Sequence, residues 1–215
     1  MITKKNFLAA LKIIDEMFPD AKGELDWETP FQLLIAVILS AQTTDKGVNK
    51  ATPALFAKFP DAEKLAQAEL SEVEACIKTI GLYRTKAKNI IRTAQMLVSD
   101  FNSELPRDKK TLQLLPGVGR KTANVVLGEA YGVPGIAVDT HVERISKRLD
   151  LVPQKATVLE VEEKLMKWIP EEDWTQSHHQ LIFFGRYHCT AKKPQCEVCP
   201  VIEYCKYGKQ HYKNV

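Results

Sequence analysis

The sequence predicts a nearly all-α fold. Helical spacing of apolar residues recurs along the 215 residues, and strand-like alternation is nearly absent. Glycines and prolines stand between the helical segments, where they form turns or end helices. With 45% hydrophobic residues, the chain can bury a substantial core, as one large domain or as two small ones. The segment GVPGI, residues 132–136, is the best candidate for a crossing between two domains.

Two apolar segments predict the first helices. MITKKNFLAALKIIDEMF, residues 1–18, has amphipathic spacing and lacks the apolar core and cleavage site of a secretory signal. FQLLIAVILSAQ, residues 31–42, is apolar all round, which is typical of a helix at the centre of a bundle. Its apolar run is too short to cross a bilayer. We therefore expect a cytoplasmic protein with no membrane partner.

The segment SEVEACIKTIG, residues 71–81, predicts a further helix. Ser71 and Glu74 have the spacing of a capping box, and Gly81 is suited to end the helix. Cys76 falls on the apolar face and is expected to act as a small hydrophobic residue. Prolines mark expected element boundaries elsewhere, at Pro30, Pro53, Pro60, Pro106, Pro116, Pro134, Pro153 and Pro170.

Residues 115–123, LPGVGRKTA, form the most informative turn. Their spacing matches neither a mononucleotide P-loop nor a dinucleotide-binding fingerprint. A helical segment that Asp108 can cap precedes the turn, and a helix that Gly132 can end follows it. Two glycines allow a tight turn with bare N–H groups beside a helix N-terminus, which suits a bound anion. The same pattern is compatible with a simple αα-corner.

The charge distribution is compatible with a polyanionic partner. The formal net charge is only +3, from 30 basic and 27 acidic residues, so composition alone does not indicate nucleic acid. Basic residues cluster in YRTKAK (83–88), RISKR (144–148) and CTAKKPQC (189–196). Each cluster alone is typical of a solvated surface, whereas several clusters near turns favour a polyanion.

Four of the five cysteines form a candidate metal site. They lie close together near the C-terminus, with the spacing C-x6-C-x2-C-x5-C. Disulfides are disfavoured in a reducing cytosol, so a shared metal is the better explanation. Four thiolates in one compact loop suit a [4Fe–4S] cluster, and structural zinc takes the same ligand type. The four ligands are Cys189, Cys196, Cys199 and Cys205.

The glycine turn, the cysteine loop and three further motifs together resemble the endonuclease III family of the helix-hairpin-helix DNA glycosylase superfamily. The motifs are ILSAQTTD (38–45), GLYRTKAKNI (81–90), LPGVGRKTANVV (115–126), AVDTHVERISKRL (137–149) and the cysteine loop. They cover most of the chain. The resemblance implies an all-α protein of two helical domains with a DNA cleft between them. The expected domains are a six-helix barrel at residues 22–132, and an iron–sulfur domain made of residues 1–21 and 133–215.

The same resemblance implies how the protein holds DNA. Backbone amides of Gly117, Val118 and Gly119 would bind a DNA phosphate, often together with a monovalent cation. Lys192 and Lys193, in a loop that a [4Fe–4S] cluster would shape, are expected to contact further phosphates. The expected partner is damaged double-stranded DNA, and the protein is expected to act as a monomer.

Lys121 and Asp139 are the expected catalytic residues. The family's Schiff-base lysine falls at Lys121, whose amine must be neutral to attack a sugar C1′. The helix N-terminus, the neighbouring Arg120 and burial would all favour the neutral amine. Asp139 is expected to cap the helix that begins near Thr140. The resemblance also gives Asp139 a role in stabilising cationic sugar character and in proton transfer.

A base inside a duplex must be flipped out before an enzyme can excise it. By resemblance, Gln42 and Leu82 fill the gap from opposite loops. An ordinary helix end at Gln42 and a buried loop hydrophobe at Leu82 are the alternatives. His141 is a candidate DNA contact near the lesion, or simply a residue of the first turn of its helix.

The leading functional hypothesis is a bifunctional DNA glycosylase and abasic-site lyase of base excision repair. It would excise oxidised or fragmented pyrimidines through a lysine Schiff base and β-elimination. An adenine-type mismatch glycosylase of the same superfamily would need a glutamate where this chain has Val37. A non-catalytic iron–sulfur DNA-binding module is the third alternative, and the joint presence of Lys121 and Asp139 argues against it.

Overall fold

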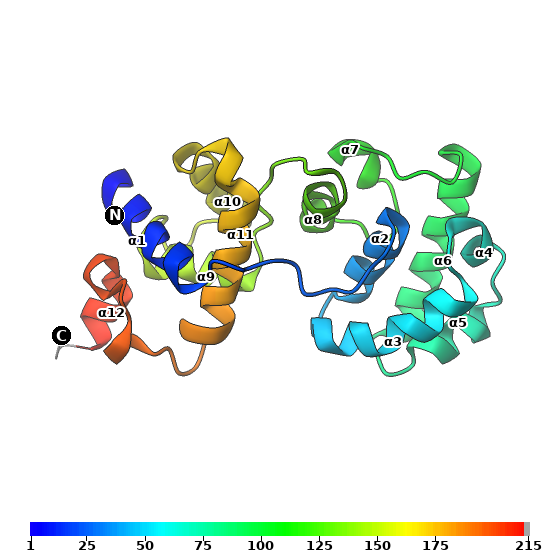
Figure 1. Cartoon of the computed structure of the whole chain (residues 1–215), viewed down its shortest axis with the longest axis horizontal. Helices are drawn as coiled ribbons and strands as arrows, with labels where there is room; N and C mark the ends of the chain where they lie inside the picture. The colour runs from blue at the N-terminus through cyan, green and yellow to red at the C-terminus, as the bar shows by residue number, and fades with distance from the viewer. Residues whose placement is uncertain (213–215) are drawn as a thin grey trace. The chain divides into compact units, whose positions relative to one another are not determined.

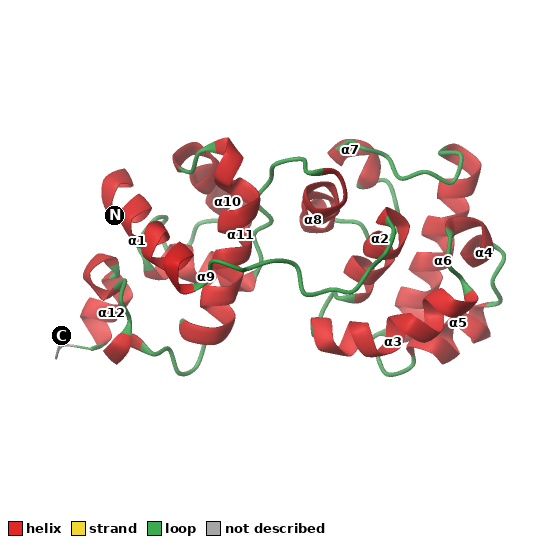
Figure 2. Cartoon of the chain, viewed as in Figure 1, coloured by secondary structure: helices red, strands yellow, loops and turns green. Residues whose placement is uncertain are grey.

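The computed structural model describes residues 1–212, which lie in helices and in the loops that join them (Figure 2). The predicted all-α fold is confirmed, and within the described residues every helix is too short or too polar to cross a membrane. The α-helices are α1 (Lys4–Met17), α2 (Pro30–Leu39), α3 (Asp45–Lys58), α4 (Ala62–Ala66), α5 (Leu70–Ile77), α6 (Tyr83–Asp100), α7 (Lys109–Leu112), α8 (Arg120–Tyr131), α9 (Thr140–Arg148), α10 (Val158–Trp168), α11 (Trp174–Phe183) and α12 (Lys206–His211). The shorter turns are η1 (Glu171–Asp173), a π-helical segment η2 (Phe184–His188), η3 (Cys196–Val198) and η4 (Ile202–Tyr204).

The chain divides into two compact units (Figure 1). One unit consists of Glu24–Val133, and the other combines Met1–Gly23 with the chain from Pro134 onward. The second crossing falls between Val133 and Pro134, inside the GVPGI segment. Each unit has its own cluster of buried apolar side chains, so each can be described as a separate helical core.

Helix α2 lies at the centre of the unit formed by residues 24–133. Its N-terminus is capped by Thr29, whose side chain accepts a hydrogen bond from the Gln32 N–H (3.2 Å). Pro30 occupies the first helical position, where its missing N–H costs no helical hydrogen bond. Every residue from 31 to 39 is buried, and burial of each large apolar side chain contributes about 1.5–3 kcal/mol. The predicted central helix is therefore confirmed.

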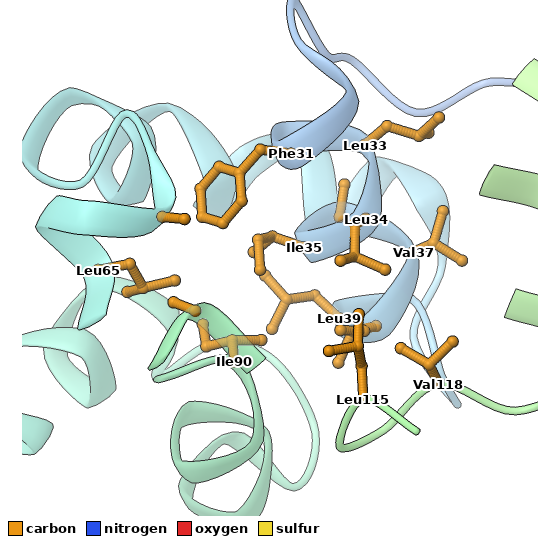
Figure 3. Packing of buried hydrophobic residues seen from close by; sticks show 14 of the residues in the cluster. Phe31, Leu33, Leu34, Ile35, Val37, Leu39, Leu65, Ile90, Leu115 and Val118 are labelled. Carbon is orange, nitrogen blue, oxygen red and sulfur yellow. The ribbon is translucent and has the colours of Figure 1, made fainter. Parts of the chain in front are cut away.

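The turn between α7 and α8 packs directly on α2. Leu115 and Val118 are buried, and Figure 3 shows both of them next to Leu39 of α2. The hydroxyl of Thr93, in α6, donates to the Pro116 carbonyl (2.9 Å). The turn is thus attached to two helices, which makes it a rigid part of this unit.

The two glycines of the turn have different structural roles. Gly117 has a φ of +79°, in the left-handed region, and a Cβ there would lie 3.1 Å from Ile38 Cγ2. Gly119 precedes α8 with a φ of −89°, and a Cβ there would have no neighbour within 4 Å. The positive φ and the close Ile38 side chain therefore require glycine at position 117. Position 119 has room for a larger side chain.

Helix α1 belongs to the core of the other unit. Thr3 caps it, and Phe7 and Ile14 lie on its buried face, so the predicted amphipathic N-terminal helix is confirmed. The π-helical segment η2 packs closely on α9 in the same unit. A Cβ on Gly185 would lie only 2.7 Å from the Cβ of His141, so glycine permits the approach of these two elements.

The predicted capping box at Ser71 and Glu74 is wrong. Helix α5 begins at Leu70, after Glu69, and no side chain accepts a hydrogen bond at its N-terminus. Ser71 is therefore a residue of the first turn rather than the cap. Leu70 packs against the apolar core, and this tertiary contact favours the earlier start.

Two expected boundaries are also wrong. Pro53 lies inside α3 rather than at an element boundary, in a helix that buries Val48 and Leu55. The burial of this apolar face outweighs the helical hydrogen bond that proline removes. Gly81 does not end α5, because the helix already ends at Ile77 and Gly81 lies in the loop that follows.

The glycine turn provides a stability prediction with an internal control. Gly117→Ala should lower the free energy of unfolding by about 1–3 kcal/mol, because alanine is strained at positive φ. Gly119→Ala should leave it within about 0.5 kcal/mol, because the site is open. Denaturant unfolding of both variants measures the difference, and equal stabilities would contradict the role assigned to Gly117.

Candidate functional site

The turn at residues 115–119 presents backbone donors beside the start of α8. The Val118 N–H donates to the Leu115 carbonyl (3.1 Å) and is therefore engaged within the turn. The N–H groups of Gly117 and Gly119 form no hydrogen bond within residues 1–212. The N-cap residue of α8 is Gly119, which has no side chain that could accept a hydrogen bond from the first N–H groups of the helix. The positive end of α8 is therefore open to an anion.

Lys121 is the second residue of α8, next to Arg120. Its side chain is exposed, so the burial that we expected at this position is absent. The reason is the helix geometry, since α8 turns Ala123, Val126 and Leu127 toward the core and leaves its first turn outside. An exposed amine is accessible to a large substrate.

Asp139 caps α9, as predicted. Its carboxylate accepts hydrogen bonds from the backbone N–H groups of His141 (2.8 Å) and Val142 (2.9 Å). These bonds fix the side chain at the N-terminus of the helix. Asp139 belongs to the unit that contains residue 134 onward, whereas Lys121 belongs to the unit of residues 24–133.

His141 is a partly buried residue of the first turn of α9. Burial lowers the pKa of its imidazole, the Asp139 carboxylate opposes that change, and the Arg144 guanidinium adds to it. The His141 Nδ1 lies 3.1 Å from Arg144 Nη2. The ring is thus held within its own unit, and its contact with DNA stays a prediction.

Gln42 and Leu82 are both exposed residues with a left-handed backbone. Their φ angles are +55° and +59°, and Leu82 is 63% exposed. A non-glycine residue in this region is disfavoured by roughly 1–2 kcal/mol. The alternatives of a buried loop hydrophobe and an ordinary helix end are therefore wrong. Both residues are held in a strained conformation that leaves their side chains in solvent.

The four predicted metal ligands come together around one pocket in the unit that contains residues 134–212. Cys189, Cys196, Cys199 and Cys205 all line it, and none of these four forms a disulfide. Four thiolates around one pocket are the ligand set of an iron–sulfur cluster, in which the thiolates bind different iron atoms, and structural zinc takes the same ligand type.

Burial favours the neutral form of the thiols that line this pocket. Burial, together with the neighbouring thiolates, raises the pKa of the Cys199 thiol to about 11. Burial raises the pKa of Cys196 and Cys205 as well. Because metal ligation requires thiolates, an occupant has to displace these protons with its own positive charge. The Gly208 N–H donates to Cys205 Sγ (3.4 Å), as is common at sulfur ligands.

Two arginines of the RISKR cluster (144–148), expected to face a polyanion, bind the cysteine loop instead. Arg148 Nη1 donates to Cys189 Sγ (3.1 Å) and to the Thr190 carbonyl (2.8 Å). Arg144 Nη2 donates to the carbonyl oxygens of Gly185 (2.8 Å) and Cys189 (3.2 Å). Arg144 and Arg148 are four residues apart in α9, so both lie on one face of the helix. This spacing was the feature of the sequence from which their shared contact with the cysteine loop could have been predicted.

The lysines of the CTAKKPQC and YRTKAK clusters differ in their exposure to solvent. Lys192 and Lys193 are exposed in the loop between Cys189 and Cys196, where they remain available to a polyanion. Lys86, from the YRTKAK cluster, is only 5% exposed, so the expectation that this cluster faces a polyanion is wrong for Lys86. The position of Lys86 on the inner face of α6, with Ala87, Ile90 and Ile91, explains its burial.

Comparison with known proteins gives a consistent assignment. Residues 35–171 match the HhH-GPD superfamily of base excision DNA repair proteins, and residues 189–205 match the iron–sulfur binding domain of endonuclease III. The chain is 51% identical to endonuclease III of Bacillus subtilis over 214 residues, which cover 100% of this chain and 98% of that protein. It is 47% identical to endonuclease III of Escherichia coli strain K12 over 209 residues, or 97% and 99% of the two chains.

Solved structures agree with this assignment. A trapped covalent intermediate of endonuclease III with DNA superposes with a TM-score of 0.95 and 53% identity, covering 98% of this chain and 99% of that one. A non-covalent endonuclease III–DNA complex gives a TM-score of 0.96 and 52% identity, covering 99% and 100% of the two chains. The chain therefore belongs to the HhH-GPD superfamily of base excision DNA repair proteins and, within it, to the endonuclease III family of iron–sulfur DNA glycosylases and abasic-site lyases.

Proposed function

We propose that the protein acts as a monomer on double-stranded DNA and excises oxidised or fragmented pyrimidines. The observation that carries the proposal is the exposed Lys121 on the first turn of α8, directly after a turn with two unengaged amides. An amine and an anion site on adjacent residues suit a reaction at a sugar beside a phosphate. Duplexes with one oxidised pyrimidine each, scored separately for base release and strand cleavage, test the substrate class. Release from none of them contradicts it.

Lys121 is assigned the role of nucleophile. Its neutral Nζ attacks C1′ of the damaged nucleotide, the bond between C1′ and the base breaks, and the base leaves with the proton that the new amine gives up. The C1′–O4′ bond then breaks, O4′ takes up a proton, and a protonated Schiff base forms between Nζ and C1′. The resulting iminium at C1′ makes the C2′ proton acidic, and loss of that proton expels the 3′ phosphate by β-elimination. Water then hydrolyses the Schiff base and frees the amine. The relative trapped in a covalent intermediate with DNA supports this route.

Asp139 is assigned to stabilise cationic character on the sugar and to assist proton transfer around Lys121. Its two backbone hydrogen bonds hold the carboxylate in one orientation, which avoids reorganisation during the reaction. The cap and the catalytic role are compatible, because each carboxylate oxygen has more than one lone pair.

The remaining DNA contacts are divided between the two units. The N–H groups of Gly117 and Gly119 would hold a DNA phosphate, with a monovalent cation nearby, and the engaged amide of Val118 would serve mainly to shape the turn. In the other unit, Lys192 and Lys193 would contact further phosphates, and His141 would lie near the lesion. These contacts position the duplex without reading its sequence.

Gln42 and Leu82 are assigned to fill the gap that the flipped nucleotide leaves. Both side chains are exposed although their backbones are strained, and strain of this kind persists at functional positions where surrounding structure supports it. An amide and an apolar side chain could satisfy the unpaired base and replace the lost stacking, respectively.

A [4Fe–4S] cluster is the proposed occupant of the cysteine pocket, with Cys189, Cys196, Cys199 and Cys205 as ligands. When bound, the cluster supplies a compact charged core that orders the loop bearing the basic side chains. Arg148 contacts both the first ligand and the backbone after it, so the loop and α9 would be ordered together.

The adenine-type alternative is disfavoured by the environment of Val37. This residue is 7% exposed in α2 and packs in the apolar cluster, so the position offers no group that could protonate a leaving adenine. The non-catalytic alternative predicts binding without turnover. Reduction with a hydride reagent in the presence of abasic DNA distinguishes it, because only a nucleophilic amine forms a reducible Schiff base.

Lys121→Gln removes the amine and keeps a polar side chain of useful length. Hydride trapping and strand cleavage should disappear under single-turnover conditions at saturating enzyme, while binding to abasic DNA persists through the remaining contacts. Asp139→Asn should slow catalysis and retain some trapping. If Lys121 only contacted a phosphate, cleavage would persist and the salt slope of binding would fall by about 0.9. Normal cleavage by Lys121→Gln would remove this residue from the mechanism.

Replacement of both Gln42 and Leu82 by alanine should weaken lesion capture more than binding to intact duplex. The gap exists only after a base has left the stack, so the lost contacts matter only at a lesion. Parallel titrations with intact duplex and with duplex that carries a stable abasic-site analogue measure the effect. Equal losses on both duplexes would reject the assignment.

Cys199→Ser should impair retention of the iron–sulfur cluster and weaken DNA binding, because a ligand of the ordered loop is lost. Cys76→Ser is the matched control, since Cys76 lies in α5, far along the chain from the pocket, and lines no part of it. Iron content and visible absorbance of anaerobically purified protein report the result. Stoichiometric zinc without iron in the unmutated protein would contradict the cluster assignment.

A further inference from the structure

Lys86 places a buried cation next to an exposed loop. It lies in the first turns of α6 and is 5% exposed. Its Nζ donates to the Leu39 carbonyl (2.9 Å), the Ala41 carbonyl (2.6 Å) and the Thr43 hydroxyl (3.0 Å). An ammonium group has three donors, and each of them has an acceptor here.

The acceptors lie on both sides of Gln42. Leu39 is the last residue of α2, so its carbonyl is at the negative end of the helix, where a cation is favoured. Ala41 and Thr43 are the immediate neighbours of Gln42. Gln42 itself supplies no acceptor, and its side chain is exposed. The ammonium thus holds the backbone around Gln42 and leaves the Gln42 side chain free.

The main chain of the same lysine contacts the second strained residue. The Lys86 N–H donates to the Leu82 carbonyl (3.0 Å), and Leu82 precedes α6 with a φ of +59°. The two loops are also close to each other, since a Cβ on Gly81 would lie 4.0 Å from the Gln42 carbonyl oxygen. The Lys86 N–H bond to Leu82 is the first i→i−4 bond of α6, which any residue at position 86 would make, so the Lys86 side chain holds the Gln42 loop alone and the Leu82 loop is its neighbour.

A role in stability alone gives an incomplete account of this arrangement. Burial lowers the pKa of the Lys86 ammonium, which reflects the cost of removing a cation from water. The acceptors that we observe are neutral oxygens rather than a carboxylate, so the charge is not offset by an ion pair. An apolar side chain of similar size could fill the same space without that cost.

We propose that Lys86 is a positioning residue that holds Gln42 in its strained conformation before DNA binds. This inference rests on the proposed role of Gln42 in filling the gap. Because the Gln42 loop is ordered in advance, less conformational entropy is lost when its side chain enters the duplex. Lys86 acts through this loop and does not contact DNA itself, since its side chain is buried.

The principal variant is Lys86→Met, which keeps an unbranched side chain only one heavy atom shorter and removes the three donors. Lys88→Met is the matched control, since Lys88 is exposed in the same helix and has the same charge. For Lys86→Met, the preference for duplex with a stable abasic-site analogue over intact duplex should fall about tenfold. Lys88→Met should change the affinity for both duplexes alike and leave the preference unchanged.

A spectroscopic readout separates positioning from loss of fold. With 2-aminopurine opposite the abasic-site analogue, saturating wild-type protein should change the fluorescence as the gap is filled. Lys86→Met should give a smaller change at saturation, at a temperature well below its thermal unfolding midpoint. Cleavage of abasic DNA should show a raised KM and a single-turnover rate at saturating enzyme close to that of the wild type.

A double-mutant cycle identifies the route of action. If Lys86 acts through Gln42, Lys86→Met combined with Gln42→Ala should discriminate no worse than the poorer single variant, so the two losses should not add. Fully additive losses overturn the proposal. If Lys86→Met does not fold, Thr43→Val decides, because it removes only one acceptor of the ammonium and should lower the preference partially.

The remaining outcomes are also decisive. A folded Lys86→Met protein with wild-type preference and fluorescence overturns the proposal, as does wild-type behaviour of Thr43→Val where Lys86→Met is unfolded. If Gln42→Ala leaves lesion preference intact, the Gln42 loop has no role that Lys86 could support, and the inference fails. Hydride trapping at Lys121 is independent of all these measurements, so the lyase assignment would survive that failure.

Discussion

The burial of residues 31–39 in α2 is the constraint on which the unit of residues 24–133 depends. All nine residues from 31 to 39 are enclosed by neighbouring helices, so each part of the chain that touches α2 has little freedom to move. The glycine turn rests on this helix through Leu115 and Val118 (Figure 3). The loop of Gln42 leaves its C-terminal end. A rigid apolar centre thus positions two functional loops that are themselves exposed.

Helix α9 has a comparable function in the other unit. Its N-terminus is capped by Asp139, and its later turns carry the arginines that bind the backbone of the cysteine loop. The helix has nine residues and spans about 13 Å. The proposed catalytic carboxylate and the ligand loop are therefore attached to one short rigid element. A cluster that orders the loop would also stabilise the helix that holds Asp139.

Three of the positions assigned a function depart from what local structure favours. Gln42 and Leu82 adopt positive φ angles although neither is glycine, and Lys86 is buried although it carries a charge. Each departure has a cost that ordinary packing would avoid. Departures of this kind are expected where a protein retains geometry for a ligand. In this unit they occur side by side, at the loops next to α2 and α6.

The sequence by itself determined the helical fold, the central apolar helix, the caps at Asp108 and Asp139 and the candidate ligand loop. These features depend on periodicity, on side chains that bond their own neighbouring backbone, and on local spacing, all of which a linear chain displays. Its motifs also indicated the family, through the order of several weak signals.

Only the tertiary structure decided which basic residues are buried and which are free. Lys86, Arg144 and Arg148 resemble surface charges in the sequence, yet they bind carbonyl oxygens of segments that lie more than forty residues away in the chain. The start of α5 at Leu70 and the helical position of Pro53 likewise depend on packing against distant helices. Burial and long-range hydrogen bonds are properties of the folded chain, because they depend on neighbours that only folding brings together.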